Sequence, residues 1–151
     1  LRILMGLEHA DSGSISGIDI KSISCMFQEN RLIPDLSAID NVRIVLRGKP
    51  NRQEIRNNLL SILPDDSLDM PVNSLSGGMK RRVALARALS YPGKLIILDE
   101  PFTGLDKNTK LNVIDYILKM RNNRTLLIAT HGTDDANLLR AEIIKLDKNI
   151  N

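Results

Sequence analysis

Residues 95–101 have the sequence Leu-Ile-Ile-Leu-Asp-Glu-Pro, a short apolar strand followed by two adjacent carboxylates. Upstream, residues 75–79 (Leu-Ser-Gly-Gly-Met) introduce an apolar stretch of helical length. Ser76 is a favourable N-cap for that helix, and Gly77 and Gly78 let an anion approach the backbone closely. Free N–H groups at a helix N-terminus bind phosphate. The two segments together indicate two parts of a nucleoside triphosphatase site.

A third part of such a site is missing. No stretch matches G-x-x-x-x-G-K-S/T, the loop that normally cradles the phosphates. The two Gly-Lys pairs, at residues 48–49 and 93–94, are followed by Pro50 and Leu95 and lack the earlier glycine. Residues 1–7 are typical of the end of an apolar helix. We therefore expect the N-terminal strands of the domain to be absent from this sequence.

Composition narrows the class of protein. At 151 residues with 42% hydrophobic content, the chain is long enough for one domain or a large piece of one. Aromatic residues make up only 3%, so a base-stacking surface for nucleic acid is not expected, despite a net charge of +3. Cys25 is the only cysteine, which excludes an internal disulfide and fits a reducing cytoplasm and a buried structural role. No apolar run is long enough to span a membrane.

Hydrophobic patterning predicts an α/β fold. We expect strands at 13–20 (a short strand or hairpin), 24–27, 95–98, 125–130 and 143–146, and helices at 38–46, 53–63, 78–89, 109–120 and 134–139. This alternation implies a mostly parallel sheet with helices on both faces, interrupted by a helical insertion. Gln28, Asp99, Glu100 and His131 then follow strands at the carboxyl edge of the sheet, where ligands bind.

These polar residues suit phosphate chemistry. Asp99 would hold Mg²⁺ through water, because magnesium keeps much of its hydration. Glu100 would polarise the attacking water, and a positioned base raises a rate by about 10²- to 10⁴-fold. His131 could bind a terminal phosphoryl oxygen or position the water. Gln28 could contact a metal-bound water, and Lys80, Arg81 and Arg82 would add positive charge near the Ser-Gly-Gly turn.

Each residue also has a purely structural interpretation. Carboxylates after a core strand can form an acidic loop. Ser76 could simply cap a helix whose residues 80–82 form a basic solvent face. His131 and Gln28 could be exposed loop residues, and Asp106, at the end of the turn 103–106, could be a helix cap.

Taken together, the motifs resemble those of the ATP-binding cassette (ABC) ATPases. In chain order they are Gln28, LSGGMKRRVALARAL from Leu75, LIILDEP from Leu95, TGLD from Thr103, and His131. The resemblance runs over nearly the entire chain. It implies that Gln28 is the Q-loop glutamine, which senses Mg²⁺ and the γ-phosphate. It also implies that Asp99 and Glu100 are the second Walker motif and its catalytic base, and that His131 is the switch histidine.

The same resemblance implies a dimer. Ser76, Gly77 and Gly78 would form the signature loop, which binds the ATP held by an opposing subunit, and Asp106 would be the D-loop aspartate at the dimer interface. Two subunits would sandwich two ATP molecules head to tail, with ATP and Mg²⁺ as the bound groups.

The resemblance further implies a domain plan and a cellular setting. Residues 1–151 would be a partial P-loop NTPase-like domain. Its parts would be 1–28 (end of the Walker A helix, short strands and Q-loop), 29–75 (helical subdomain) and 76–151 (signature helix, Walker B and switch region). The segments SGGMKRR and LDEPFTGLD look closest to the nitrate, sulfonate and taurine type of importer. Membrane-spanning permease subunits and an extracytoplasmic solute-binding protein would be partners, on the cytoplasmic face of the membrane, with no nucleic acid.

Two departures and two alternatives accompany this interpretation. Without a first Walker motif, the chain alone should not bind or hydrolyse ATP, and Gly132 stands where an acidic residue often follows the switch histidine. One alternative is a soluble ABC ATPase of DNA repair, chromosome structure or translation. The span from Gln28 to Ser76 is too short for the long coiled coil of the repair and chromosome types. The other alternative is a catalytically dead gene remnant.

Overall fold

The computed structural model describes residues 1–145. Its centre is a parallel three-stranded sheet in the order β1 (Ile23–Met26), β2 (Leu95–Asp99) and β3 (Thr125–Ala129). Met26 pairs with Leu98, and Asp99 pairs with Ala129, so the three strands end at the same edge. Helices connect successive strands, as a parallel sheet requires. The predicted α/β class and parallel sheet are confirmed.

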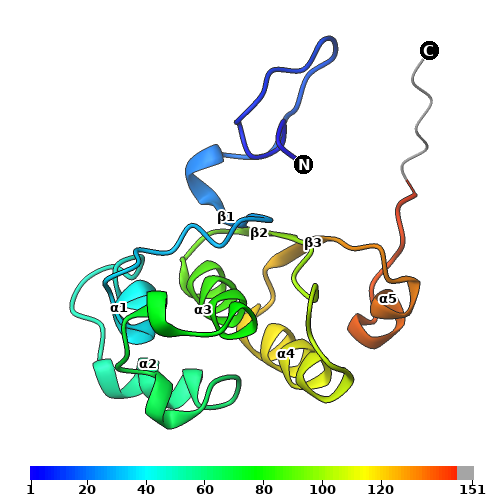
Figure 1. Ribbon diagram of the computed structural model, residues 1–151. Helices are drawn as coiled ribbons and strands as arrows, with labels where there is room; N and C mark the ends of the chain where they lie inside the picture. Colours follow the sequence, from blue (N-terminus) through cyan, green and yellow to red (C-terminus); the bar gives the residue numbers. More distant parts are fainter. Residues whose placement is uncertain (146–151) are drawn as a thin grey trace.

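Helices α3 (Gly77–Ser90) and α4 (Lys107–Met120) cover one face of the sheet (Figure 1). Strand alternation directs Met26, Ile96 and Leu98 into the same core as the buried faces of these helices. The sequence after β3 continues into α5 (Thr133–Leu139). This face holds the larger of the two hydrophobic cores.

The opposite face of the sheet carries a smaller core. Ile23 and Ile97 pack there with Met5, and Leu1 and Leu4 lie against them. Residues 1–7 form turns in which the N–H of Met5 bonds to the carbonyl of Leu1, consistent with the predicted end of a helix. Figure 1 shows this N-terminal segment on the side of the sheet away from α1–α4.

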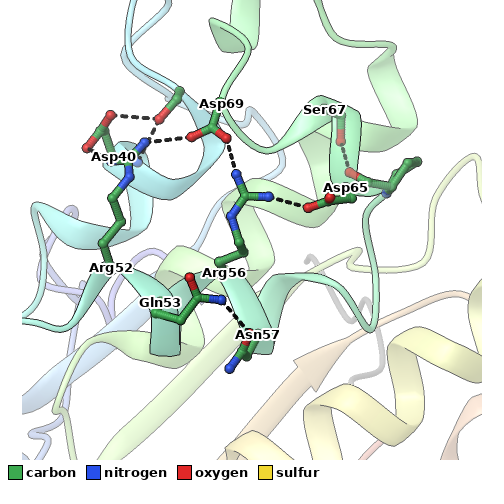
Figure 2. Close-up of polar contacts among 10 residues, drawn as sticks. Asp40, Arg52, Gln53, Arg56, Asn57, Asp65, Ser67 and Asp69 are labelled. Carbon is green, nitrogen blue, oxygen red and sulfur yellow. Dashed lines mark hydrogen bonds and ion pairs between the residues drawn. The ribbon is translucent and has the colours of Figure 1, made fainter.

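A helical segment separates β1 from α3. It contains α1 (Ala38–Arg43), α2 (Arg52–Leu59) and two short 3₁₀ turns, η2 (Asp65–Ser67) and η3 (Val72–Ser74). A further 3₁₀ turn, η1 (Ile20–Ser22), precedes β1. Helices α1 and α2 lie beside α3, away from the sheet (Figure 1). Ion pairs tie the segment together on its outer surface; Figure 2 shows those of Arg52 and Arg56 with Asp40, Asp65 and Asp69.

Several predicted elements need correction. The strand at 13–20 is wrong: Gly13 and Gly17 adopt left-handed φ values of 83° and 79°, which interrupt an extended chain, and no strand among the described residues pairs with this segment. The helices predicted at 38–46 and 53–63 are shorter, ending at Arg43 and Leu59. In the strand predicted at 143–146, residues 143–145 are exposed and without strand structure, and Leu146 lies outside the described residues.

Candidate functional site

The carboxyl edge of the sheet gathers the polar residues that the sequence singled out. Gln28 follows β1, Asp99 ends the central strand β2, and His131 follows β3. Because the strands are parallel and in register, these residues lie at one edge of the sheet. Glu100 follows the central strand and so lies between the ends of β1 and β3. The juxtaposition predicted from the strand ends is thus present.

Glu100 is held in an unusual backbone conformation. Its φ is +50°, a region that costs a non-glycine residue free energy and recurs at functional sites. Its N–H bonds to the carbonyl of Ala129 at 2.9 Å, which anchors it to the end of β3. The carboxylate accepts a hydrogen bond from Thr103 Oγ1 at 3.3 Å. The turn therefore gives the Glu100 side chain a direction that strand alternation alone would not produce.

Glu100 and His131 are brought together. His131 Nε2 lies 3.4 Å from Glu100 Oε1. The Glu100 carboxylate is 20% exposed and the imidazole is 99% exposed, so the pair runs from a half-buried carboxylate out to solvent. A carboxylate and an imidazole at this distance can share the positioning of a water molecule.

The buried carboxylate of Asp135 holds the loop that carries His131 in place. Asp135 accepts a hydrogen bond from Thr130 Oγ1 at 2.7 Å and forms an ion pair with Lys110 of α4. A Cβ at Gly132 would lie 2.7 Å from an oxygen of Asp135. A side chain at Gly132, where the family often has an acidic residue, would therefore have to displace the Asp135 carboxylate.

Asp99 and Gln28 were predicted to hold Mg²⁺. Asp99 is half-buried at the end of β2, on the sheet face of Ile97, while the Gln28 side chain is exposed. Within residues 1–145, no cluster of three or more His, Cys, Asp or Glu side chains could enclose a metal. One or two carboxylate or amide oxygens still suit Mg²⁺, which takes its remaining ligands from water and substrate phosphates. The donor set fits a metal that arrives with a nucleotide.

The Ser76-Gly77-Gly78 turn opens α3. Ser76 Oγ accepts the N–H of Met79 at 3.3 Å and is the N-cap. A Cβ added at Gly77 would meet nothing within 4 Å, and one at Gly78 would meet only the side chain of Arg82, at 3.6 Å. Glycine in a helix costs about 0.5–1 kcal/mol relative to alanine. Nothing in the described fold requires the two glycines, so the open space above them is available to a ligand from outside.

Asp106 is the N-cap of α4. Its Oδ1 accepts the N–H groups of Asn108 and Thr109 at 3.0 and 3.1 Å. The hydroxyl of Thr109 and these backbone bonds lower the pKa of Asp106. Asp106 therefore caps the helix, as one interpretation of the sequence predicted, and its carboxylate remains exposed.

Arg81 is a site residue that the sequence interpretation misplaced. It was assigned to a basic cluster facing solvent or phosphate, but it is 7% exposed and points inward. Burial lowers the pKa of its guanidinium, and the charges of Asp99 and Glu100 offset this only in part. A signal was present, because Leu85 and Ala88, four and seven positions on, are buried on the same face of α3.

Cys25 has the structural role that was expected. It is half-buried and packs against the smaller core with Leu95 and Leu127. Burial raises the pKa of its thiol, so the nucleophilic thiolate is disfavoured.

Comparison with known proteins identifies the family. A protein-family model described as ABC transporter matches residues 1–103. The chain belongs to the ABC transporter family. This ABC chain resembles an ATP-binding cassette solved as a dimer in a post-hydrolysis state bound to ADP and phosphate. The TM-score is 0.66 and the identity 30%, with 79% of this chain and 56% of that chain covered.

Curated relatives of this ABC chain are named as import ATP-binding proteins. It is 38% identical over 148 residues to an aliphatic sulfonates import ATP-binding protein of Paracoccus denitrificans, covering 97% of this chain and 61% of the relative. It is 40% identical over 157 residues to a protein of the same description from Corynebacterium glutamicum, covering 97% and 63%. A sulfate/thiosulfate import ATP-binding protein of Burkholderia mallei is 33% identical, covering 97% and 48%.

The chain thus spans less than two thirds of the length of these relatives. The predicted family resemblance is confirmed, and relatives named for sulfonate import belong to the predicted nitrate, sulfonate and taurine type. No helix within the described residues combines the length and apolar character needed to cross a bilayer.

Proposed function

We propose that this chain is part of the ATP-binding and ATP-hydrolysing subunit of an ABC importer. The observation that carries the proposal is the contact between Glu100 and His131 at the end of the central strand. Glu100 would act as the general base that activates water. His131 would hold that water or the terminal phosphoryl oxygen. Asp99 and Gln28 would hold Mg²⁺, which neutralises charge on the phosphate oxygens.

The open glycine turn supports a dimer in which each subunit completes the other's site. Gly77 and Gly78 meet no packing requirement within their own fold, and their N–H groups open a helix of 14 residues. A phosphate carried by a companion cassette would be bound there by free N–H groups and the helix dipole. Asp106, exposed at the start of α4, would lie at the same interface. Closure of this dimer on ATP would drive the membrane subunits between their two states.

The partners follow from the importer assignment. We place the chain on the cytoplasmic face of the membrane, bound to permease subunits that work with an extracytoplasmic solute-binding protein. The names of the relatives favour an importer of sulfonate or sulfate type. The soluble repair and chromosome types find no support, because α1 and α2, with 6 and 8 residues, form no coiled coil.

The test uses a complete cassette, meaning this chain preceded by a first Walker motif. Glu100→Gln removes the base but keeps its shape, so we expect hydrolysis to fall by about 10²- to 10⁴-fold while ATP binding remains. Light scattering should then show a stable dimer in ATP and Mg²⁺. Asp115→Asn, which changes a carboxylate on α4 away from the site, is the control. Hydrolysis by Glu100→Gln at the parental rate would refute the assignment of the base.

A further inference from the structure

Arg81 lies on the first turns of α3, just beyond the Ser76-Gly77-Gly78 turn. Its guanidinium reaches the ends of two strands at once. Nη1 donates to the carbonyls of Phe27 and Gln28, both at 2.7 Å. Nη2 donates to the carbonyls of Asp99 and Glu100, the latter at 2.8 Å. One side chain therefore joins α3 to the backbone at Gln28 and Glu100.

These bonds hold the chain where it leaves the sheet. Phe27 and Gln28 follow β1, Asp99 ends β2, and Glu100 comes next with a left-handed backbone conformation, which costs a non-glycine residue free energy. A guanidinium is planar and presents several donors in a fixed fork, so it fixes the relative position of its acceptors. Lysine, with one compact ammonium, cannot do this for two strand ends.

Stability alone does not explain a buried arginine at position 81. Every acceptor it uses among the described residues is a backbone carbonyl or the Asn30 side chain at 3.3 Å, and its Nε is buried without a partner there. The charges of Asp99 and Glu100 favour the guanidinium, but within residues 1–145 neither carboxylate forms an ion pair with it, and burial still imposes a desolvation cost on the cation. Apolar residues could fill the same position between helix and sheet, so its geometry indicates a positional role.

We propose that Arg81 is a positioning residue for hydrolysis, which links the signature turn to Gln28 and Glu100 of the same chain. The inference rests on the proposed function. In the head-to-tail dimer, the signature turn contacts the companion's ATP, whereas Gln28 and Glu100 act on the chain's own ATP. Arg81 is then a direct physical connection between the two ATP sites. A displacement of α3 when the companion's phosphate binds moves the carbonyls that Arg81 holds.

Arg124 provides a matched control. It is also a partly buried arginine whose bonds go to carbonyls, those of Leu89, Tyr91, Met120 and Arg121 at 2.6–2.9 Å. It sits just before β3, at the opposite end of the sheet from Glu100. Loss of either guanidinium removes several backbone hydrogen bonds, but only Arg81 touches the strand ends that carry the site.

The experiment compares Arg81→Gln, Arg81→Lys and Arg124→Gln in the complete cassette. We expect Arg81→Gln to lower kcat by about 100-fold with KM for ATP changed much less, since small displacements of catalytic groups have this effect. Arg81→Lys should recover only part of the rate, and the Hill coefficient for ATP should fall in both variants. Arg124→Gln should lose stability but keep kcat and the Hill coefficient. Equal kcat values in Arg81→Gln and Arg124→Gln would overturn the proposal.

A second readout needs no catalysis. Hydrogen exchange of the nucleotide-free protein should speed up at residues 27–30 and 99–103 in both Arg81 variants, and at neither segment in Arg124→Gln. If the parental cassette hydrolyses no ATP, the proposed function fails, and this exchange pattern still decides the role of Arg81. Unchanged exchange at both segments would refute the positioning role even in an active enzyme.

Discussion

Single glycines in this chain serve two different purposes. Gly93 is required by its own fold, because a Cβ there would lie 2.6 Å from the carbonyl oxygen of Ser22. Gly77 lies in a helix with open space around it. Residue type alone does not separate these cases; the distance from the missing Cβ to its neighbours does.

This contrast predicts opposite results for two alanine substitutions. Gly77→Ala should leave the free energy of unfolding unchanged or raise it by up to about 1 kcal/mol, since alanine favours a helix. In the complete cassette it should nevertheless impair ATP hydrolysis. Gly93→Ala should lower stability by about 1–3 kcal/mol through overpacking. Urea unfolding and an ATPase assay measure both effects. A Gly77→Ala cassette with parental activity would show that the turn receives no ligand.

At the scale of elements, local sequence patterns predicted the positions of the core helices and strands accurately. The helix predicted at 78–89 is α3, Gly77–Ser90, and the strand at 95–98 is β2, Leu95–Asp99. Caps and apolar periodicity are local signals, which explains this agreement. The strand at 13–20 failed because extended structure needs a neighbouring strand, and alternation in the sequence does not say whether one exists.

The helical segment is held by charge as well as by its apolar core. Asp40 accepts hydrogen bonds from Ser37 Oγ and from Arg52 Nη1 at 2.7 and 2.9 Å. Burial opposes ionisation of Asp40, but the bond from Ser37 and the charges of Arg52 and Arg43 outweigh it and lower its pKa below 3.8. Arg52 also pairs with Asp69, so the network joins α1, α2 and the turn after η2 (Figure 2).

This network predicts an acid-labile contribution to stability. A carboxyl with a lowered folded-state pKa stabilises the fold fully above its unfolded pKa, near 3.8, and loses that contribution as pH falls through the lower folded value. Asp40→Asn should therefore destabilise the chain by about 1 kcal/mol at pH 7 and by less near pH 3. Asp66→Asn, at an exposed carboxylate of η2, is the control. Thermal melts across this pH range test it, and a pH-independent difference would contradict it.

At the scale of the whole molecule, the described sheet has two unpaired edges. Strands β1 and β3 each pair only with β2 among the described residues, so the outer side of each presents backbone donors and acceptors without a strand partner there. Large apolar side chains are also exposed. Ile20 has 61% of its surface accessible, and Ile144 has 77%. Such edges and patches favour association with other chains.

We therefore expect residues 1–151 expressed alone to self-associate or aggregate. Light scattering over a range of concentrations should show a rising mass, and a hydrophobic dye should bind the native state. A complete cassette, with a strand added to the sheet, should show less of both. A soluble monomer with a sharp cooperative melt would contradict this expectation.

The α/β class, the family and the order of the motifs could be inferred from sequence because each depends on local patterns of apolar residues, caps and glycines. The tertiary structure alone revealed that Arg81 faces inward, that Glu100 has a left-handed backbone with its carboxylate 3.4 Å from His131 Nε2, and that Gly77 and Gly78 have open space around them. Arg81 reaches a carbonyl 53 positions away along the chain. A contact over that separation depends on how α3 packs against the sheet, and no local pattern encodes it.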